Sequence, residues 1–255
     1  MIANYHTHTT RCNHAEGADR AYVESALVAG LKILGFSDHS PCPFPGDYKS
    51  RHRMKLEELE GYVQSVLSLR KEFEGQIQIP LGLELEYYPH LMPQLLPILR
   101  DYPIDYMLLG QHFLGNEIDE PYCGNVTGDR RMLEQYCDQA IAGMETGLFT
   151  YFAHPDLIHY VGEDSVYLAQ MRRLCRAAKD CGMPLEWNLL GMTQGRHYPE
   201  RRFWEVAAEE NCDVIIGWDA HKPRVLEATE PLVQAVRQIR ELDMHLLDTV
   251  PLRKL

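Results

Sequence analysis

The chain repeats one pattern seven times: a short apolar run, a polar loop and then a longer stretch with helical spacing. The apolar runs lack clean alternation, which is typical of parallel strands that are covered on both faces. The predicted strands are Ile2–Tyr5, Ile33–Phe36, Ile77–Leu83, Tyr106–Leu109, Thr150–Phe152, Pro184–Trp187 and Val214–Ile216. The predicted helices are Asp19–Ala29, Leu56–Phe73, Leu91–Leu99, Arg130–Thr146, Ser165–Lys179, Glu200–Glu209 and Pro231–Leu242.

Seven strand–helix units predict an α/β fold, either a closed or nearly closed (βα) barrel or an open, doubly wound sheet. Glycines follow several of the helical stretches, among them Gly30 and Gly147, as glycines at helix C-termini do. No linker rich in Pro, Gly and Ser divides the chain, and the proline-rich stretch from Ser40 to Gly46 is predicted to be a loop after the second strand. We therefore expect one domain over residues 1–255.

Histidines follow five of the seven predicted strands, and a carboxylate ends a sixth. Parallel strands share one direction, so these residues meet at one face, which is the face where barrels place their active sites. An H-x-H pair sends both imidazoles to the same side, because side chains alternate along a strand. The pattern predicts a metal site built from imidazole and carboxylate groups. Its candidate residues are His6, His8, His14, His39, Glu84, His112, His154, Asp219 and His221.

Five further histidines lie elsewhere in the pattern. His52, His90 and His245 are expected on the surface or in loops. His159 and His197 fall in loops on the predicted active face, so a role in substrate binding stays open for both.

The composition narrows the class of protein. With 25 Lys+Arg against 37 Asp+Glu the formal charge is −12, which disfavours non-specific binding to nucleic acid. No apolar run reaches the length of a membrane helix, and the first residues do not resemble a secretory signal. The seven cysteines include no C-x-x-C pair. We expect reduced thiols in a cytoplasmic protein that has no membrane or nucleic-acid partner.

In this order, the strand-end residues resemble the PHP (polymerase and histidinol phosphatase) superfamily, and the resemblance runs from His6 to His221. Within this superfamily, the single-domain length of the chain is most similar to that of the histidinol-phosphatase branch. That resemblance implies a distorted, TIM-like (βα)7 barrel with three divalent metal ions. It implies one ion held by His6, His8, Glu84 and Asp219, a second bridged by Glu84 and completed by His112 and His154, and a third held by His14, His39 and His221.

Two details qualify this assignment. Glu86 shares a strand face with Glu84, but the G-x-E spacing from Gly82 selects Glu84 as the metal ligand. Glu86 is expected to contact either a metal-ligating side chain, on its side away from the metal, or a loop. Asp38 is either a similar supporting group or a simple loop cap. The family commonly has N-x-x-G-x-R after the sixth strand, and here Thr193 takes the arginine position.

The loop after the sixth strand is therefore the place to look for substrate contacts. Arg196 follows Thr193 by three residues and is the candidate replacement for the family arginine, with His197 beside it as a second candidate contact. Cys12 lies between His8 and His14, but a loop thiol without a phosphate-binding helix N-terminus is expected to be inert.

Such a site suits a phosphate monoester. Three divalent cations outweigh two carboxylates, so the pocket is positive, and a metal lowers the pKa of bound water to about 7. We expect metal-bound hydroxide to be the nucleophile, with no catalytic side chain beyond the ligands, and Zn, Fe or Mn as the metal. The expected substrate is L-histidinol phosphate, within the class of small phosphorylated metabolites.

Three alternatives stay open. The first is a PHP-type phosphatase for another small phosphate ester or a nucleotide. The second is an amidohydrolase-type barrel, which also starts with H-x-H but uses a Lys or a carboxylate on its fourth strand, where this chain has His112. The third is a metal-binding module without catalysis, against which the complete set of ligands argues.

Overall fold

The computed structural model describes residues 1–255, and parallel pairing connects its strands. β1 and β2 form a two-stranded sheet, and β3 to β8 form a six-stranded sheet in sequential order. The strands are β1 (Ala3–Asn4), β2 (Ile33–Leu34), β3 (Gly82–Leu85), β4 (Tyr106–Gly110), β5 (Tyr151–Ala153), β6 (Leu185–Asn188), β7 (Asp213–Gly217) and β8 (His245–Leu246). The predicted α/β class with a parallel sheet is confirmed.

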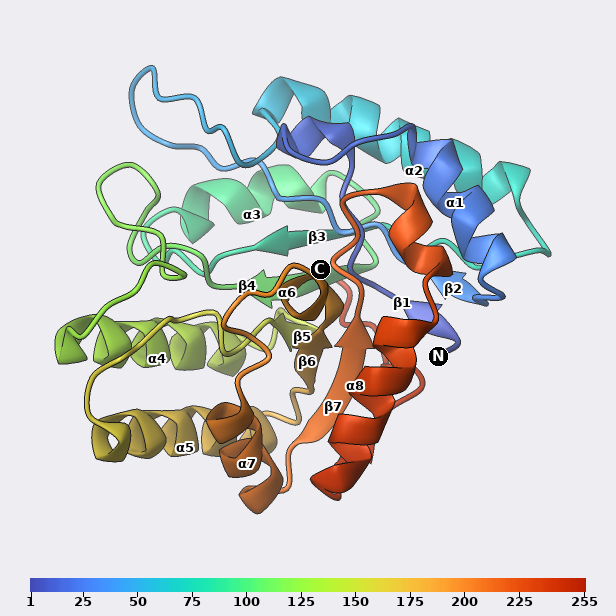
Figure 1. Cartoon of the computed structure of the whole chain (residues 1–255). Helices are drawn as coiled ribbons and strands as arrows, with labels where there is room; N and C mark the ends of the chain where they lie inside the picture. The colour runs from blue at the N-terminus through green and yellow to red at the C-terminus, as the bar shows by residue number, and fades with distance from the viewer.

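Single bridges, instead of continuous ladders, link the two sheets. On one side Phe36 pairs with Leu81, and His39 pairs with Glu84. On the other side Thr7 pairs with Ala220, just beyond the ends of β1 and β7. Strands β1 to β7 thus follow one another around a ring (Figure 1), in the distorted, barrel-like arrangement expected from the sequence.

The helices lie mainly outside this ring (Figure 1). They are α1 (Asp19–Val28), α2 (Leu59–Glu72), α3 (Met92–Arg100), α4 (Arg130–Glu145), α5 (Asp164–Asp180), α6 (Leu189–Thr193), α7 (Arg201–Glu209) and α8 (Glu230–Glu241). Asp129 caps α4 by accepting a hydrogen bond of 2.8 Å from the amide of Arg131. Gly147 follows the same helix with a φ of 69°, a backbone conformation that glycine adopts at little cost.

Two hydrophobic clusters separate the inside of the ring from the outside. The larger cluster, of 58 buried residues, joins the outer faces of the strands to the helices. The smaller one contains Tyr106, Leu108 and Tyr151 from the strands, Tyr5 directly after β1, and Val250 from the C-terminal segment. This smaller cluster, called here the lower core, fills the part of the interior away from the histidines.

The largest departures from the predicted elements concern β3, β8 and α6. β3 begins at Gly82 instead of Ile77, because only isolated bridges pair the earlier part of that apolar run. β8 has only two residues, and α6 is a short helix directly after β6, so both are too short for a periodic sequence pattern to predict them. No helix is both long and apolar enough to span a membrane.

Candidate metal centre

The nine predicted ligands converge where the strands end. Glu84 lies on β3, and His154 is the first residue after β5. The remaining ligands come from the segments that follow β1, β2, β4 and β7. Six of the nine are buried, whereas His112 and His221 are half-buried and His14 is exposed at the edge of the cluster. Because the strands are parallel and short, their ends bring ligands from distant parts of the chain to one place.

Glu84 is the centre of the cluster, and it is 1% exposed. Its Oε1 lies 2.8 Å from Nε2 of His154 and 3.5 Å from Nε2 of His112. Its Oε2 lies 3.4 Å from Nε2 of His6 and 3.5 Å from Nε2 of His8. The two oxygens of one carboxylate therefore face different sets of imidazoles, which is the arrangement a bridging ligand needs.

Asp219 closes the cluster from the end of β7. Its Oδ1 lies 3.0 Å from Nε2 of His8 and 3.4 Å from Nε2 of His6. These three residues can place one ligand atom each around a common point. The D-x-H spacing thus delivers the aspartate to the H-x-H pair, as the alternation of side chains predicts.

A third group of ligands consists of imidazoles alone. His14, His39 and His221 also place ligand atoms within reach of one ion. The ring centroids of His14 and His221 are 4.7 Å apart, and those of His14 and His39 are 5.3 Å apart. His39 is shared, because its Nδ1 lies 3.1 Å from Oε2 of Glu84.

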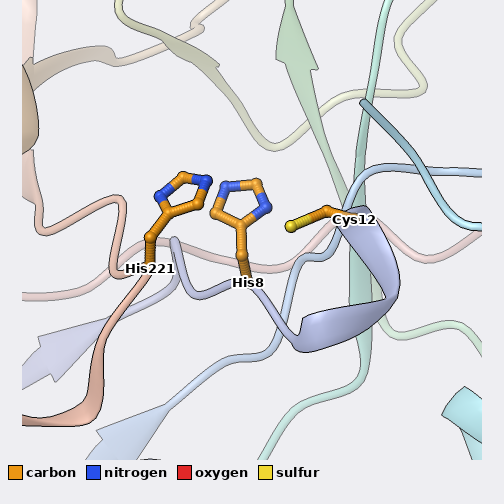
Figure 2. A group of neighbouring side chains, drawn as sticks. All are labelled: His8, Cys12 and His221. Atoms are coloured by element: carbon orange, nitrogen blue, oxygen red, sulfur yellow. The ribbon is translucent and has the colours of Figure 1, made fainter. Parts of the chain in front are cut away.

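Cys12 also approaches this cluster. Figure 2 shows the imidazole of His8 between His221 and Cys12, with the sulfur pointing toward the His8 ring. The rings of His8 and His221 stack at 4.1 Å. Burial and the charge of Asp38 raise the pKa of the Cys12 thiol far above its ordinary value, so this sulfur stays protonated without a metal.

Unpartnered polar atoms test whether the cluster suits metal ions. Of the ten buried side-chain atoms that lack a hydrogen-bond partner, six belong to the predicted ligands. Such atoms are costly in a protein interior unless an ion or water satisfies them. They are His6 Nε2, His8 Nε2, Glu84 Oε2, His154 Nδ1, Asp219 Oδ1 and His221 Nε2. The donor set, imidazole with carboxylate, fits a divalent transition metal.

In several of these imidazoles, the ring nitrogen that points away from the cluster has a hydrogen-bond partner. Nδ1 of His8 faces Asp38 at 3.4 Å, and Nδ1 of His112 faces Glu86 at 2.9 Å. Nδ1 of His14 hydrogen-bonds the carbonyl of Cys12 at 2.7 Å. A partner of this kind fixes which nitrogen carries the proton and turns the other toward the metal.

Glu86 and Arg53 form a buried ion pair behind His112. Nη1 and Nη2 of Arg53 donate to the two oxygens of Glu86 at 2.9 and 3.0 Å, and Nε donates to Glu117 at 2.7 Å. Although burial opposes the charged form, Arg53 and His112 hold the pKa of Glu86 at about 2. Glu86 thus supports His112 instead of competing with Glu84.

The charges divide the imidazoles into two sets. Burial opposes protonation of His8, but Asp219 and Asp38 hold its pKa at about 9. Burial, with the charge of His8, instead lowers the pKa of His221 to about 3. Burial also lowers the pKa of His14 and of His39. The third group therefore consists of neutral imidazoles with free lone pairs at neutral pH.

A cavity of about 940 Å³ opens over the cluster. Arg196 and His197 both line it, as predicted for the loop after the sixth strand. Nη1 of Arg196 donates to the hydroxyl of Tyr198 at 2.8 Å, and its Nε and Nη2 donate to Gln194 at 3.0 and 2.8 Å. Thr193 bonds back to the carbonyl of Leu189 within α6.

The two candidate loop histidines form one unit. His159 and His197 stack with centroids 4.0 Å apart and planes within 6° of each other, and both line the cavity. Nε2 of His197 hydrogen-bonds the carbonyl of Leu157 at 2.8 Å. Burial and the charge of His159 lower the pKa of His197 to about 4, so this ring is neutral at neutral pH.

The sequence pattern missed several residues of this region. His52, expected on the surface or in a loop, lines the cavity together with Tyr122 and Arg53. Glu186 on β6 is 0% exposed and contacts His6. A charged residue between Leu185 and Trp187, in an otherwise apolar strand, was the one available signal for Glu186.

The chain is similar to known proteins over most of its length. The family described as PHP domain matches residues 4–190. A protein of Deinococcus radiodurans named "Probable histidinol-phosphatase" is 30% identical, over 94% of this chain and 94% of that protein. The histidinol-phosphatase of Bacillus subtilis is 26% identical, over 85% of this chain and 92% of that protein.

A solved structure has a similar fold. It is the crystal structure of histidinol phosphate phosphatase from Lactococcus lactis, complexed with zinc, L-histidinol and phosphate. It superimposes with a TM-score of 0.75, at 18% identity, over 98% of this chain and 97% of that one.

Proposed function

Because the chain belongs to the PHP domain family, in its histidinol-phosphatase branch, we propose that it is a metal-dependent phosphoric monoester hydrolase acting on L-histidinol phosphate. The products are L-histidinol and phosphate. The observation that carries the proposal is the ligand cluster around Glu84 at the floor of a cavity of about 940 Å³. The names of the relatives support the choice of substrate.

We propose that three divalent cations, Zn, Fe or Mn, bind at the three groups of ligands. His6, His8, Asp219 and Glu84 would hold the first, Glu84 with His112 and His154 the second, and His14, His39 and His221 the third. When bound, such cations supply water of lowered pKa as a nucleophile and neutralise the charge of a phosphoryl group.

The protein's own side chains set the charge and the shape of the pocket. His6, His8 and the two carboxylates form a polar floor from which the surrounding chain excludes bulk water, since all four are at most 4% exposed. Arg196 and Lys222 line the cavity above this floor. With the proposed cations bound in this floor, a phosphate dianion would meet positive charge below it, and it would meet Arg196 and Lys222 above it.

Arg196 and His197 are the proposed substrate contacts. The guanidinium of Arg196 presents several donors at the cavity wall, and it can exchange its bonds to Gln194 for a bidentate grip on phosphate oxygens. The stack of His197 on His159 gives a flat wall, in which the His197 ring is neutral at neutral pH. A planar, weakly basic ring such as the imidazole of the substrate can pack against such a surface.

A panel of phosphate esters tests the substrate. Protein purified without chelator, then loaded with Mn²⁺ or Zn²⁺, should release phosphate from L-histidinol phosphate with the highest kcat/KM of the panel. Removal of the metals should stop the reaction, and their return should restore it. Equal rates on nucleotides and sugar phosphates would mean that the enzyme acts on a broader class of phosphate esters. If the metal-loaded protein released phosphate from no ester, the proposal would be overturned.

A further inference from the structure

We propose that Glu186 is a positioning residue that orients ligands of two of the three metal positions at once. The inference rests on the proposed metal-dependent function. Glu186 lies on β6, is 0% exposed and has no Arg or Lys partner, so it is a buried carboxylate whose one ion-pair partner is His6. Burying such a group without a cation is expensive unless hydrogen bonds stabilise it.

Four donors meet the two oxygens of Glu186. Oε1 lies 2.8 Å from Nδ1 of His6 and accepts from the hydroxyl of Tyr151 at 3.2 Å. Oε2 accepts from the backbone amide of His154 at 3.1 Å and from Nδ2 of Asn188 at 2.9 Å. An ionised carboxylate accepts at both oxygens and donates nothing, so it matches this set of donors.

The contact with His6 fixes the tautomer of that ring. With Nδ1–H donated to Glu186, the lone pair of a neutral His6 sits on Nε2. That nitrogen is unpartnered and lies 3.4 Å from both Glu84 and Asp219, in the first proposed metal position. Glu186 therefore decides whether His6 can be a ligand.

The contact with His154 acts on the backbone. His154 has a φ of 33°, in the left-handed region that a residue with a β-carbon adopts only when its surroundings hold it there. The hydrogen bond from its amide to Glu186 is one such restraint. Its side chain meets Oε1 of Glu84, in the second proposed metal position.

Asn188 extends the same control to Asp219. Its Oδ1 accepts from the amide of Gly191 at 2.9 Å, which fixes the orientation of the side-chain amide. Its Nδ2 then donates to both Glu186 and Oδ2 of Asp219, at 2.9 and 3.2 Å. Oδ1 of Asp219 is left unpartnered and facing His8 and His6. Asp219 also has a left-handed backbone, with a φ of 49°.

Gly217 makes room for this group. It pairs with Asn188 across β6 and β7, and a β-carbon on it would overlap Oε1 of Glu186. Any side chain at this position would push the carboxylate away from His6. Residues of both β6 and β7 thus determine where the carboxylate of Glu186 lies.

An amide cannot replace this carboxylate. In Glu186→Gln, an amide nitrogen facing His6 would force Nδ1 to accept and move the proton to Nε2, which removes the ligand lone pair. In the opposite orientation, the amide nitrogen would face the donors of His154 and Asn188. In the first orientation, the proton on Nε2 of His6 would face Oε2 of Glu84, the ligand that the first and second positions share. In the second orientation, the amide would disturb His154 and, through Asn188, Asp219. His14, His39 and His221 make no hydrogen bond to Glu186.

Metal content measured during graded chelation tests the proposal. Wild-type protein and Glu186→Gln would be loaded with Mn²⁺ or Zn²⁺, dialysed against increasing chelator and analysed for bound metal. We expect affinity at two positions to fall about 10–100-fold in the variant, with one ion retained as in the wild type. The matched control is Glu86→Gln, which changes the carboxylate behind His112 and should weaken one position only.

The tautomer of His6 gives a readout that a general loss of stability would not change. In zinc-loaded wild-type protein, the ring-nitrogen NMR signals of His6 should report a proton on Nδ1, and this signature should be lost in Glu186→Gln. If Glu186→Gln does not fold, Gly217→Ala keeps the carboxylate and displaces it, with the same expected loss of two ions.

The outcomes separate the inference from the proposed function. Equal metal affinity in the wild type and in Glu186→Gln would overturn the role of Glu186 alone. Equal weakening of all three positions would also overturn it, because the effect would then be on the whole fold. A wild type that binds metals but leaves L-histidinol phosphate intact would overturn the proposed substrate and not the role of Glu186. A wild type that binds no metal would overturn both.

Discussion

The interior of the barrel is built differently at its two ends, although the same strands supply both. At the lower end Tyr106 and Tyr151 fill the space, and the hydroxyl of Tyr106 donates to the carbonyls of Tyr5 and Phe36 at 2.6 and 3.1 Å. The C-terminal segment covers this end with Val250, and the amide of Arg253 bonds to Thr150. At the upper end, six ligand atoms have no partner within the protein.

The difference shows which end is built for stability and which for binding. The tyrosine hydroxyls of the lower core have partners within the protein, so this end gains packing without leaving a group that needs a ligand. The upper end concentrates lone pairs that only an ion or solvent can satisfy. Substitutions of the ligands at the upper end should therefore change metal binding and catalysis. Substitutions at the lower end should change stability alone, except at Tyr151, whose hydroxyl contacts Glu186.

The largest expected effect is that of Glu84→Ala at the upper end. It removes both oxygens that face His6, His8, His112 and His154, so the proposed first and second ions lose their shared ligand. We expect phosphatase activity to be abolished, not merely a higher KM, and metal content to fall. Steady-state kinetics and metal analysis of the purified variant check this.

The control for Glu84 is the neighbouring carboxylate. Glu86→Ala should be milder in catalysis, because Glu86 contacts His112 from behind, but it also leaves Arg53 with Glu117 as its remaining acidic partner. If Glu86 proved essential for hydrolysis and Glu84 dispensable, the assignment of the bridging ligand would be wrong.

The second effect concerns the wall of the cavity. Arg196→Ala should retain all metals and lose about 2–3 kcal/mol in kcat/KM, near the upper end for a hydrogen bond to a charged group. Arg196→Lys keeps the charge without the planar fork and should lose much less. Unchanged kcat/KM for Arg196→Ala would mean that the phosphate is held by the metals or by another residue, such as Lys222.

The third effect is a loss of stability from a substitution at the lower end. Tyr106→Phe removes the hydroxyl that serves two buried carbonyls, and we expect the free energy of unfolding to fall by about 1–3 kcal/mol. Gly35 and Gly82 lie against this ring and have no side chain that could take over the lost hydrogen bonds. Denaturant titration measures the loss, and metal content and kcat/KM should stay at wild-type values. A loss of metal would show that the two ends are not independent.

The same contrast explains what the sequence could predict. Strand ends carry their polar residues in order, so the order of the residues alone places the histidines and Glu84 at one face. Glu186 and Arg53 could not be placed in this way, because their roles depend on contacts between distant segments. Glu186 meets a histidine 180 positions earlier, and Arg53 meets Glu117 from a long loop. β8 pairs over two residues, too few for a periodic signal.

The last effect is a gradual one, a slope of stability with pH at Asp156, which follows His154 by two residues and is 1% exposed. Burial raises the pKa of Asp156 to about 7, although its Oδ2 accepts from the amide of Glu200 and from Nε1 of Trp204. The folded state therefore holds a proton that the unfolded chain, with a carboxyl pKa of about 3.9, releases earlier. This contribution to stability is complete below about pH 4 and is lost as the pH rises toward 7, by at most about 1.4 kcal/mol per pH unit. Asp156→Asn cannot ionise, so the difference in unfolding free energy between wild type and variant should change across this range and level off above it. A difference that is constant from about pH 4 to about pH 8 would show that Asp156 stays ionised in the fold, and that the upper end holds it by hydrogen bonds alone.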